Sequence, residues 1–169
     1  NLYSLNLLAD KIENSYILPS DIWLEDNPFS ESELYSWYLL NDQIVKESAV
    51  KLNRQKEIVE TRDKDGQGMI GIAYLTKNDA AKLQLNLDEM VQKEDNDQLF
   101  WEEAFFNGSI PIQVYGKECS AEKAFEIDTY EQLRELDEKS DSLNASILTL
   151  IAQELDVEVA DIRQIEVMK

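Results

Sequence analysis

The sequence contains no histidine and a single cysteine, Cys119, among its 169 residues. Without histidine, Ser-His-Asp and Cys-His catalysis and the usual zinc sites are excluded. One cysteine cannot form an internal disulfide, which fits a reducing cytoplasm, and Cys119 is expected to be a loop residue rather than an activated nucleophile. Any chemistry must therefore use carboxylates, lysines, hydroxyls and the backbone, a set of donors that suits hard cations such as Mg²⁺.

Basic residues are scarce: 16 lysines and arginines accompany 35 acids, and the net charge is −19. Nucleic-acid backbones are bound by clustered lysines and arginines, so the absence of such a cluster predicts no nucleic-acid partner. Long apolar runs are also missing, since none approaches the ~20 residues that span a bilayer, and no signal peptide opens the chain. Most carboxylates are then expected to form a solvated surface, and the question is which few of them do something else.

Glycine is sparse too, with five residues in the chain. Gly66, Gly68 and Gly71 have the spacing of turn and strand glycines. No helix start and no Lys-Ser/Thr pair follow them, so they do not form a phosphate-binding loop. The pair Asp65-Gly66 predicts a hairpin turn.

The apolar residues that are present, within a 43% hydrophobic composition, are spaced for an α/β fold. A short buried strand at 15–18 ends in the polar loop Pro19-Ser20-Asp21, a pattern typical of an active-site edge. Antiparallel structure is expected over 49–75. That region includes a strand at 69–75. The remaining segments predict strands at 34–40, 110–115 and 124–127, and helices at 2–13, from a cap at Asn78 to 91, at 99–106 and from a cap at Thr129 to 136.

The composition changes near residue 138, where a polar link precedes a helix expected at 147–155 and a strand-like end. We predict one domain over residues 1–137, and a linker with the lead-in to a further domain over 138–169. The chain begins at Asn1 rather than Met, inside the first predicted helix, and stops at Lys169 without a terminal signal. Both ends are therefore expected to be cut from a longer protein.

Three acids follow predicted strands. Asp21 comes after the strand at 15–18, and Glu126 and Asp128 flank Ile127 at the end of another. The i, i+2 spacing places Glu126 and Asp128 on one face while the strand persists, where they repel unless a cation or hydrogen bonds compensate. Spacing alone leaves two interpretations open, a Mg²⁺ site or ordinary loop, capping and surface acids.

Three segments together resemble, in the same order, the bacterial CTP:phosphocholine cytidylyltransferases: residues 1–5 with Ile17-Leu-Pro-Ser-Asp21, Asp97-Gln-Leu-Phe-Trp-Glu102, and Phe125-Glu-Ile-Asp128 with residues 129–133. The resemblance implies part of a mixed-sheet, Rossmann-like α/β nucleotidyltransferase domain flanked by helices. It also implies cytidylyl transfer from CTP to phosphocholine or a related phosphoalcohol, in cell-envelope precursor synthesis. Asp21, Glu126 and Asp128 would bind Mg²⁺, with Asp21 as the catalytic carboxylate.

The chain departs from this family in two places. The glycine-rich, basic loop that holds CTP in the family is absent from residues 1–137. The family also encloses a quaternary ammonium in aromatic side chains by cation–π attraction, whereas this chain has Ser48-Ala49 and Leu75-Thr76 in the corresponding segments. The aromatic residues that could substitute are Trp37, Tyr38, Tyr74, Phe100 and Trp101, and we predict an acceptor pocket that includes Tyr74, Trp101 and Glu102.

Residues 147–155 and 161–169 resemble the lead-in to a choline/ethanolamine-kinase-type domain, which implies a bifunctional fusion. Two other functions are compatible with the same residues: a non-catalytic regulatory or interaction domain that has kept the fold, and a sugar-1-phosphate nucleotidyltransferase. The sequence makes no prediction of the oligomeric state.

Overall fold

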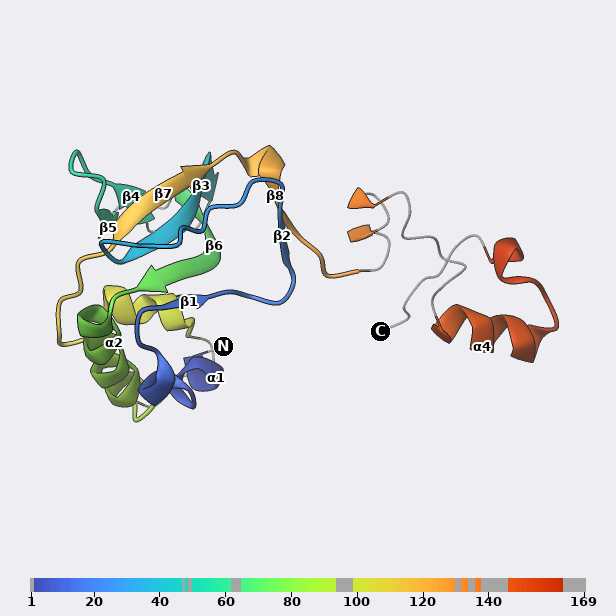
Figure 1. Ribbon diagram of the computed structural model, residues 1–169, viewed down its shortest axis with the longest axis horizontal. Helices are drawn as coiled ribbons and strands as arrows, with labels where there is room; N and C mark the ends of the chain where they lie inside the picture. Colours follow the sequence, from blue (N-terminus) through green and yellow to red (C-terminus); the bar gives the residue numbers. More distant parts are fainter. Residues whose placement is uncertain are drawn as a thin grey trace. The chain divides into compact units, whose positions relative to one another are not determined.

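The strand-forming segments of the first 126 residues build a four-stranded mixed sheet with the order β1-β6-β3-β7 (Figure 1). These strands are β1 (Ser15–Ile17), β6 (Asp65–Leu75), β3 (Trp37–Lys46) and β7 (Tyr115–Cys119). Strand β6 is antiparallel to β1 and β3, whereas β3 and β7 are parallel. Two antiparallel ribbons complete the strands: β2 (Ile22–Leu24) with β8 (Ala124–Glu126), and β4 (Val50–Leu52) with β5 (Ile58–Glu60).

This computed structural model describes residues 2–46, 48, 50–61, 65–93, 99–129, 132–133, 136–137 and 146–162. The chain divides into two compact units, Asn1–Glu126 and Ile127–Lys169. The division falls before the boundary predicted at residue 138. Because residues 138–145 lie outside the described part, the assignment of 138–169 to a further domain stays a prediction.

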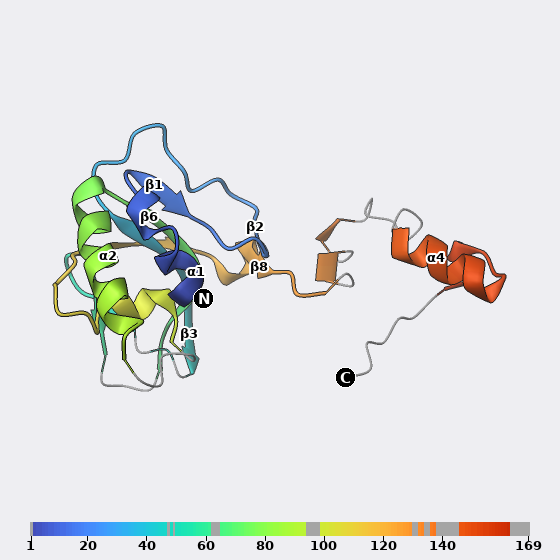
Figure 2. The ribbon, with the colours of Figure 1, turned by 90° about the horizontal axis from the view of Figure 1, so that it is seen from below.

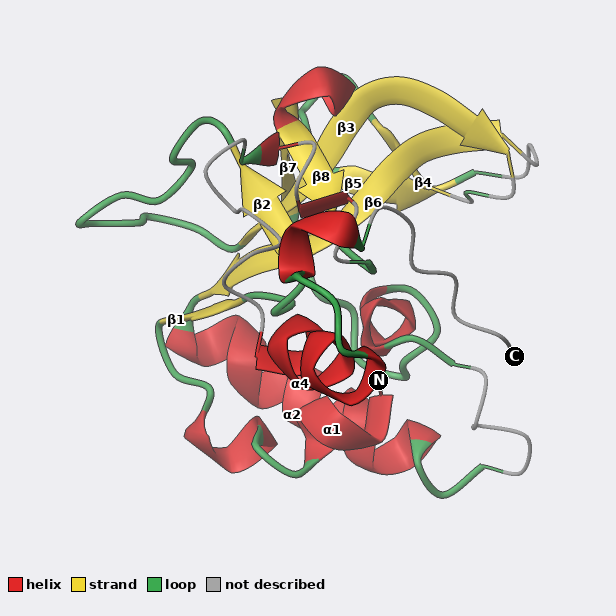
Figure 3. Cartoon of the chain, turned by 90° about the vertical axis from the view of Figure 1, so that its right-hand side faces the viewer, coloured by secondary structure: helices red, strands yellow, loops and turns green. Residues whose placement is uncertain are grey.

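One face of the sheet is closed by helices. Helix α1 (Leu2–Asn6), the 3-10 helix η1 (Ala9–Lys11), α2 (Lys77–Met90) and the 3-10 helix η3 (Trp101–Phe105) contribute to the larger core cluster, and α1 and α2 lie together on one side of the strands (Figure 3). Leu83 and Leu87 of α2 are fully buried there, and each such side chain stabilises the fold by about 1.5–3 kcal/mol.

The opposite face carries a smaller, more aromatic cluster. Its buried members are Trp37, Leu39, Ile72 and Tyr74. Tyr16 packs against Trp37, Tyr74 and Phe29 with ring centroids 4.8–5.9 Å apart. Part of the cover comes from the connection after β2, which includes Phe29, because no helix of the described residues belongs to this cluster.

The pairing of β3 with β6 is interrupted by two compensating irregularities. From the pair Tyr38–Ala73 to the pair Leu40–Met69, β3 advances two residues while β6 advances four. From there to the pair Ile44–Gln67, β3 advances four residues and β6 two, so the register returns. Extra residues in one strand of a pair form a β-bulge, which bends the strand and re-aims its groups.

Most predicted elements are present, but the first helix is not continuous. Residues 2–13 form α1 and η1, separated at Leu7 and Leu8, which are 80% and 52% exposed. The backbone bonding tightens there, because Leu7 bonds four residues back and Leu8 only three. Helix α2 is capped by Thr76, whose side chain accepts from the Asp79 N–H, and not by Asn78.

Three strand predictions also need correction. Asp65 and Gly66 lie inside β6 instead of forming a turn, and a Cβ on Gly66 would lie 2.4 Å from the carbonyl oxygen of Val50. This glycine therefore permits a close approach of backbones rather than a reversal of the chain. The strand expected at 110–115 begins only at Tyr115, after the proline-containing segment, and the strand expected at 34–40 runs instead over Trp37–Lys46.

In the second unit, the structure describes α4 (Ser146–Leu155), the 3-10 helix η6 (Val159–Asp161) and parts of the segment after Glu126. Thr129 has the predicted capping role: its side chain accepts from the Gln132 N–H, and the Gln132 side chain accepts from the Thr129 N–H. The strand-like end at 163–169, which is also the last part of the segments that resemble a kinase lead-in, lies outside the described residues. None of the helices in the described part of the chain is long and apolar enough to cross a membrane.

Candidate metal centre

Asp21 and Glu126 are brought together by the β2–β8 ribbon. The ribbon pairs Ile22 with Glu126, so Asp21 stands immediately before β2 and Glu126 ends β8. Asp128 follows two residues later. One carboxylate oxygen from each of the three acids lies within 4.8 Å of the other two. The two strands lie side by side in Figure 2, at the place where the first unit ends.

The three carboxylates are exposed, and none has a lysine or arginine partner among the described residues. Three like charges this close repel one another unless a cation neutralises them. Oxygens that share one Mg²⁺ stand at most about 4 Å apart, since each bond is about 2.1 Å. The cluster is therefore close to the required geometry, and small side-chain rotations would complete it.

The loop that carries Asp21 leaves the sheet at β1. Strand β1 pairs with the C-terminal half of β6 (Ser15 with Leu75, Ile17 with Ala73). The chain then passes through Leu18, Pro19 and Ser20 to Asp21. Because β1 is held in the sheet on one side and β2 is held by β8 on the other, the loop is anchored at both ends.

The predicted acceptor residues all lie in the interior. Trp101 and Glu102 are 4% and 8% exposed in η3, and Tyr74 is 8% exposed in β6. Trp101 belongs to the helix-covered cluster and Tyr74 to the aromatic cluster. The structure therefore does not bring Tyr74 and Trp101 into one cluster, and their role in binding an acceptor stays a prediction.

Glu102 is an acid in unusual surroundings. Its Oε1 accepts a hydrogen bond of 3.0 Å from the Tyr38 hydroxyl, and its Oε2 has no partner among the described residues. Burial is the main cause that raises the pKa of the Glu102 carboxyl above its usual value. Burial together with the nearby Glu102 charge also raises the pKa of Tyr38 well above its usual value, which keeps that hydroxyl protonated.

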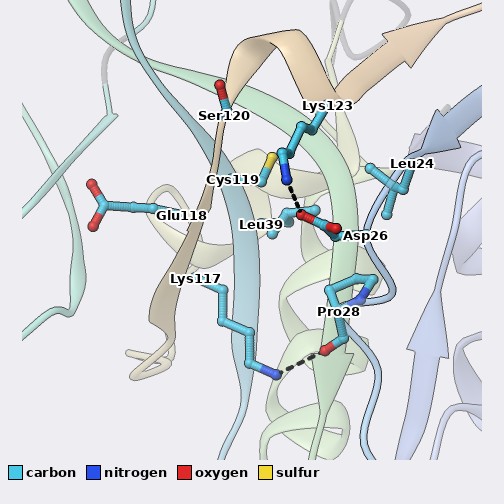
Figure 4. Close-up of a pocket in the computed structure, with 9 residues that line it drawn as sticks. All are labelled: Leu24, Asp26, Pro28, Leu39, Lys117, Glu118, Cys119, Ser120 and Lys123. Carbon is cyan, nitrogen blue, oxygen red and sulfur yellow. Dashed lines mark hydrogen bonds and ion pairs between the residues drawn. The ribbon is translucent and has the colours of Figure 1, made fainter.

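A cavity of about 510 Å³ lies beside the other end of β2 (Figure 4). Its lining combines apolar side chains with two lysines, and consists of Leu24, Asp26, Pro28, Leu39, Lys117, Glu118, Cys119, Ser120 and Lys123. The Glu118 carboxylate points away from the rest (Figure 4) and bonds Lys56 and Gln67 instead. Cys119 lies on β7, not in the expected loop, and burial raises the pKa of its thiol, which disfavours a nucleophilic role.

Both lysines of the cavity are held in place. The Lys117 ammonium lies 3.9 Å from the centre of the Trp37 ring and donates to Glu33 and to the Pro28 carbonyl. Lys123 donates to Asp26 over 2.7 Å, and this bond raises the pKa of Lys123. The cavity therefore presents two positive charges whose positions are fixed by acids and by an aromatic ring.

The roles of four residues in the cavity and around Glu102 are not evident from sequence patterns. Lys117 and Lys123 stand in a short charged stretch that looks like ordinary surface, and only the fold reveals their cavity. Tyr38 was one of several aromatic candidates for the acceptor pocket, with nothing to indicate its bond to Glu102. Gly71 was interpreted as a strand glycine, but its φ of 87° could not be read from spacing.

Comparison with known proteins adds to this geometry. Over 142 residues the chain is 22% identical to the choline-phosphate cytidylyltransferase of Streptococcus pneumoniae, a match that covers 82% of this chain and 62% of the relative. The solved structure of the CTP:phosphocholine cytidylyltransferase from the same organism matches with a TM-score of 0.65 and 22% identity, over 83% of this chain and 64% of that one. No family model matches the chain.

The chain thus spans less than two thirds of the length of either relative. The predicted resemblance to bacterial cytidylyltransferases is confirmed. The structural match also confirms the predicted fold, a mixed parallel and antiparallel sheet with helices in the manner of a Rossmann-like nucleotidyltransferase.

Proposed function

We propose that this chain is part of a Mg²⁺-dependent nucleotidyltransferase that moves a cytidylyl group from CTP to phosphocholine or a related phosphoalcohol. The observation that carries the proposal is the convergence of Asp21, Glu126 and Asp128, whose carboxylate oxygens lie within 4.8 Å of one another. The similarity to the S. pneumoniae cytidylyltransferase supports the reaction class. A role in cell-envelope precursor synthesis in the cytoplasm follows from the same proposal.

The three carboxylates would hold the cation at the end of the β2–β8 ribbon where Ile22 pairs with Glu126. Bound there, Mg²⁺ would supply positive charge to the phosphates between which the bond breaks. Asp21 has the central part, because its loop is fixed by strands at both ends. Nucleotidyl transfer depends mainly on charge neutralisation and alignment, so rigid placement of these oxygens is the chain's main contribution.

The cavity beside β2 offers a position for the phosphorylated acceptor. Ile22 and Leu24 lie on the same side of β2, and their partners Glu126 and Ala124 lie on the matching side of β8. Leu24 lines the cavity, so cavity and metal centre are two residues apart along one ribbon, about 7 Å. Lys117 and Lys123 would donate hydrogen bonds to an acceptor phosphate, which would share them with Glu33 and Asp26.

The test replaces the proposed ligands in the full-length protein. With Asp21→Ala, release of pyrophosphate from CTP in the presence of phosphocholine and Mg²⁺ should fall by at least about 100-fold. The matched control is Glu13→Gln, which alters another exposed acid outside the cluster. Turnover that survives in the Asp21 variant at the level of the control would overturn the proposal.

Two further experiments separate the proposal from its alternatives. Titration with Mg²⁺ and CTP should release heat and protect the full-length protein against unfolding, and neither effect would occur in a non-catalytic interaction domain. A product screen with several nucleoside triphosphates and with sugar-1-phosphates should give the highest turnover with CTP and a phosphoalcohol. A preference for a sugar-1-phosphate would favour that class of transferase instead.

A further inference from the structure

The buried Glu102 is connected to the loop of Asp21 through two other residues. The Tyr38 hydroxyl donates to Glu102 Oε1 over 3.0 Å and accepts from the Gly71 N–H over 2.6 Å. Tyr38 is fully buried in β3. Three elements that are distant in the sequence, β3, β6 and η3, therefore meet at one hydroxyl group.

Gly71 lies in the bulged part of β6, between the paired residues Met69 and Ala73. Its φ of 87° belongs to the left-handed region, which side chains other than glycine adopt only under strain. In this conformation its N–H donates to the side-chain hydroxyl of Tyr38 on the neighbouring strand β3. The bulge and the hydroxyl thus depend on each other.

The bulge also touches the loop of Asp21. A Cβ built on Gly71 would lie 2.7 Å from Cγ of Pro19 and 3.8 Å from Oε1 of Glu102. Pro19 therefore packs directly on the backbone of Gly71, and it stands two residues before Asp21. Because protein interiors are close-packed, a displacement of Glu102, Gly71 or Pro19 would also displace the residues it contacts.

We propose that Glu102 and Tyr38 are positioning residues for Asp21: they hold the Gly71 bulge, and the bulge supports Pro19. The importance of this network for catalysis rests on the proposed function, whereas its effect on the loop does not. Glu102 acts from within the core and does not contact the acceptor. What it contributes is a hydrogen-bond acceptor of the right shape, not a negative charge.

This assignment distinguishes two substitutions at one position. Glu102→Gln keeps an oxygen that can accept from Tyr38, and the neutral amide is suited to a buried site. Glu102→Ala removes the acceptor and leaves the hydroxyl unsatisfied. A residue that binds the cationic part of a substrate through its charge would lose its function in both variants.

The experiment measures the loop and the metal site separately in the 169-residue chain. In Tyr38→Phe and Glu102→Ala, the backbone NMR order parameters of Ser20 and Asp21 should fall from about 0.85 toward 0.6. Mn²⁺ titrated alone, as a probe for the three-carboxylate cluster, should bind about tenfold or more weakly. Glu102→Gln should stay within about threefold of the parent chain in Mn²⁺ affinity.

The control for a merely structural effect is Ser36→Ala. Ser36 is equally buried, and its hydroxyl bonds Asp79 and the Thr76 N–H at the start of α2 rather than the Asp21 loop. This variant should lose stability but keep the order parameters of Ser20 and Asp21. Unchanged order parameters in Tyr38→Phe, or a Glu102→Gln variant as impaired as Glu102→Ala, would overturn the inference. Loosening of the loop in a chain that does not bind Mn²⁺ would support the inference and contradict the proposed function.

Discussion

The acids of this protein occupy two contrasting environments. Asp21, Glu126 and Asp128 are exposed, close together and without a basic partner in the described part of the chain. Glu102 is 8% exposed, forms no ion pair with a lysine or arginine of the described residues, and is bonded to a tyrosine. In the first environment three like charges repel one another unless a cation neutralises them. In the second, burial raises the pKa of the Glu102 carboxyl and disfavours its charged form.

Acidic residues therefore contribute to this protein in two different ways, one through cation binding and one through the buried structure. Exposed acids in a repulsive group lower the stability of the metal-free fold and are useful only when they bind something. A buried carboxyl that is hydrogen-bonded contributes to the shape of its surroundings. Substitutions in the first group should therefore lower activity but not stability. Substitutions in the second group should lower stability and also change the geometry of the loop.

The largest effect is expected for Asp128→Asn. Turnover of CTP by the full-length protein should fall by at least about 100-fold, because one ligand loses its charge. The melting temperature without Mg²⁺ should stay the same or rise, since repulsion within the cluster is reduced. A loss of stability comparable to that of a core variant would show that Asp128 has a structural role instead.

Gly71→Ala should disturb the buried region directly. The new Cβ would press against Pro19, and the alanine backbone would have to adopt a left-handed conformation. We therefore expect a loss of about 1–3 kcal/mol in the free energy of unfolding. Urea denaturation measures this loss. Gly116→Ala is a useful comparison, because the three atoms nearest its Cβ belong to the Leu52 side chain, which can move, and its φ is not in the left-handed region. This substitution should cost less.

The pH dependence of stability should reveal the raised pKa of the Glu102 carboxyl. Because folding raises the pKa of this carboxyl, its contribution is present below the pKa of the unfolded chain and is lost as the pH rises through the folded pKa. Relative to Glu102→Gln, the parent chain should therefore lose up to about 1.4 kcal/mol per pH unit in that interval. A difference in stability between the two that does not vary from pH 4 to 8 would contradict a raised pKa of Glu102.

The smallest effect is expected for an exposed acid that already has a partner. Glu13 forms an ion pair with Lys77, and the two side chains are 54% and 66% exposed. Glu13→Gln should change the free energy of unfolding by no more than about 0.5 kcal/mol. The Mn²⁺ affinity of the Glu13→Gln variant should equal that of the parent chain. A larger change in stability or in Mn²⁺ affinity would contradict the distinction between the two environments.

The metal centre was partly accessible from the sequence. Asp21, Glu126 and Asp128 each follow a recognisable strand, and the order of the matching segments pointed to one family. The pairing of β2 with β8, which brings Ile22 opposite Glu126, involves positions about a hundred residues apart. No local pattern encodes that pairing, so the proximity of the acids came from the resemblance and not from their spacing.

The buried network was not accessible in the same way. The hydrogen bond between Tyr38 and Glu102 joins residues 64 positions apart. The left-handed conformation of Gly71 occurs at a bulge that the sequences of β3 and β6 do not predict. The hairpin turn predicted at Asp65-Gly66 was wrong for a related reason: Gly66 allows a close contact with another strand and does not form a turn. Local chemistry identified which segments are strands, but long-range packing determined what their glycines and tyrosines do.

The paired irregularities of β3 and β6 have one further consequence. Because the two strands regain the same register at Ile44–Gln67 that they had at Tyr38–Ala73, the distortion near Gly71 is confined to a short window of the sheet. Insertions or deletions that preserve both bulges could reshape the Asp21 loop without moving the core pairs on either side. The sheet thus confines one irregular segment, on which Pro19 rests, between two regularly paired regions.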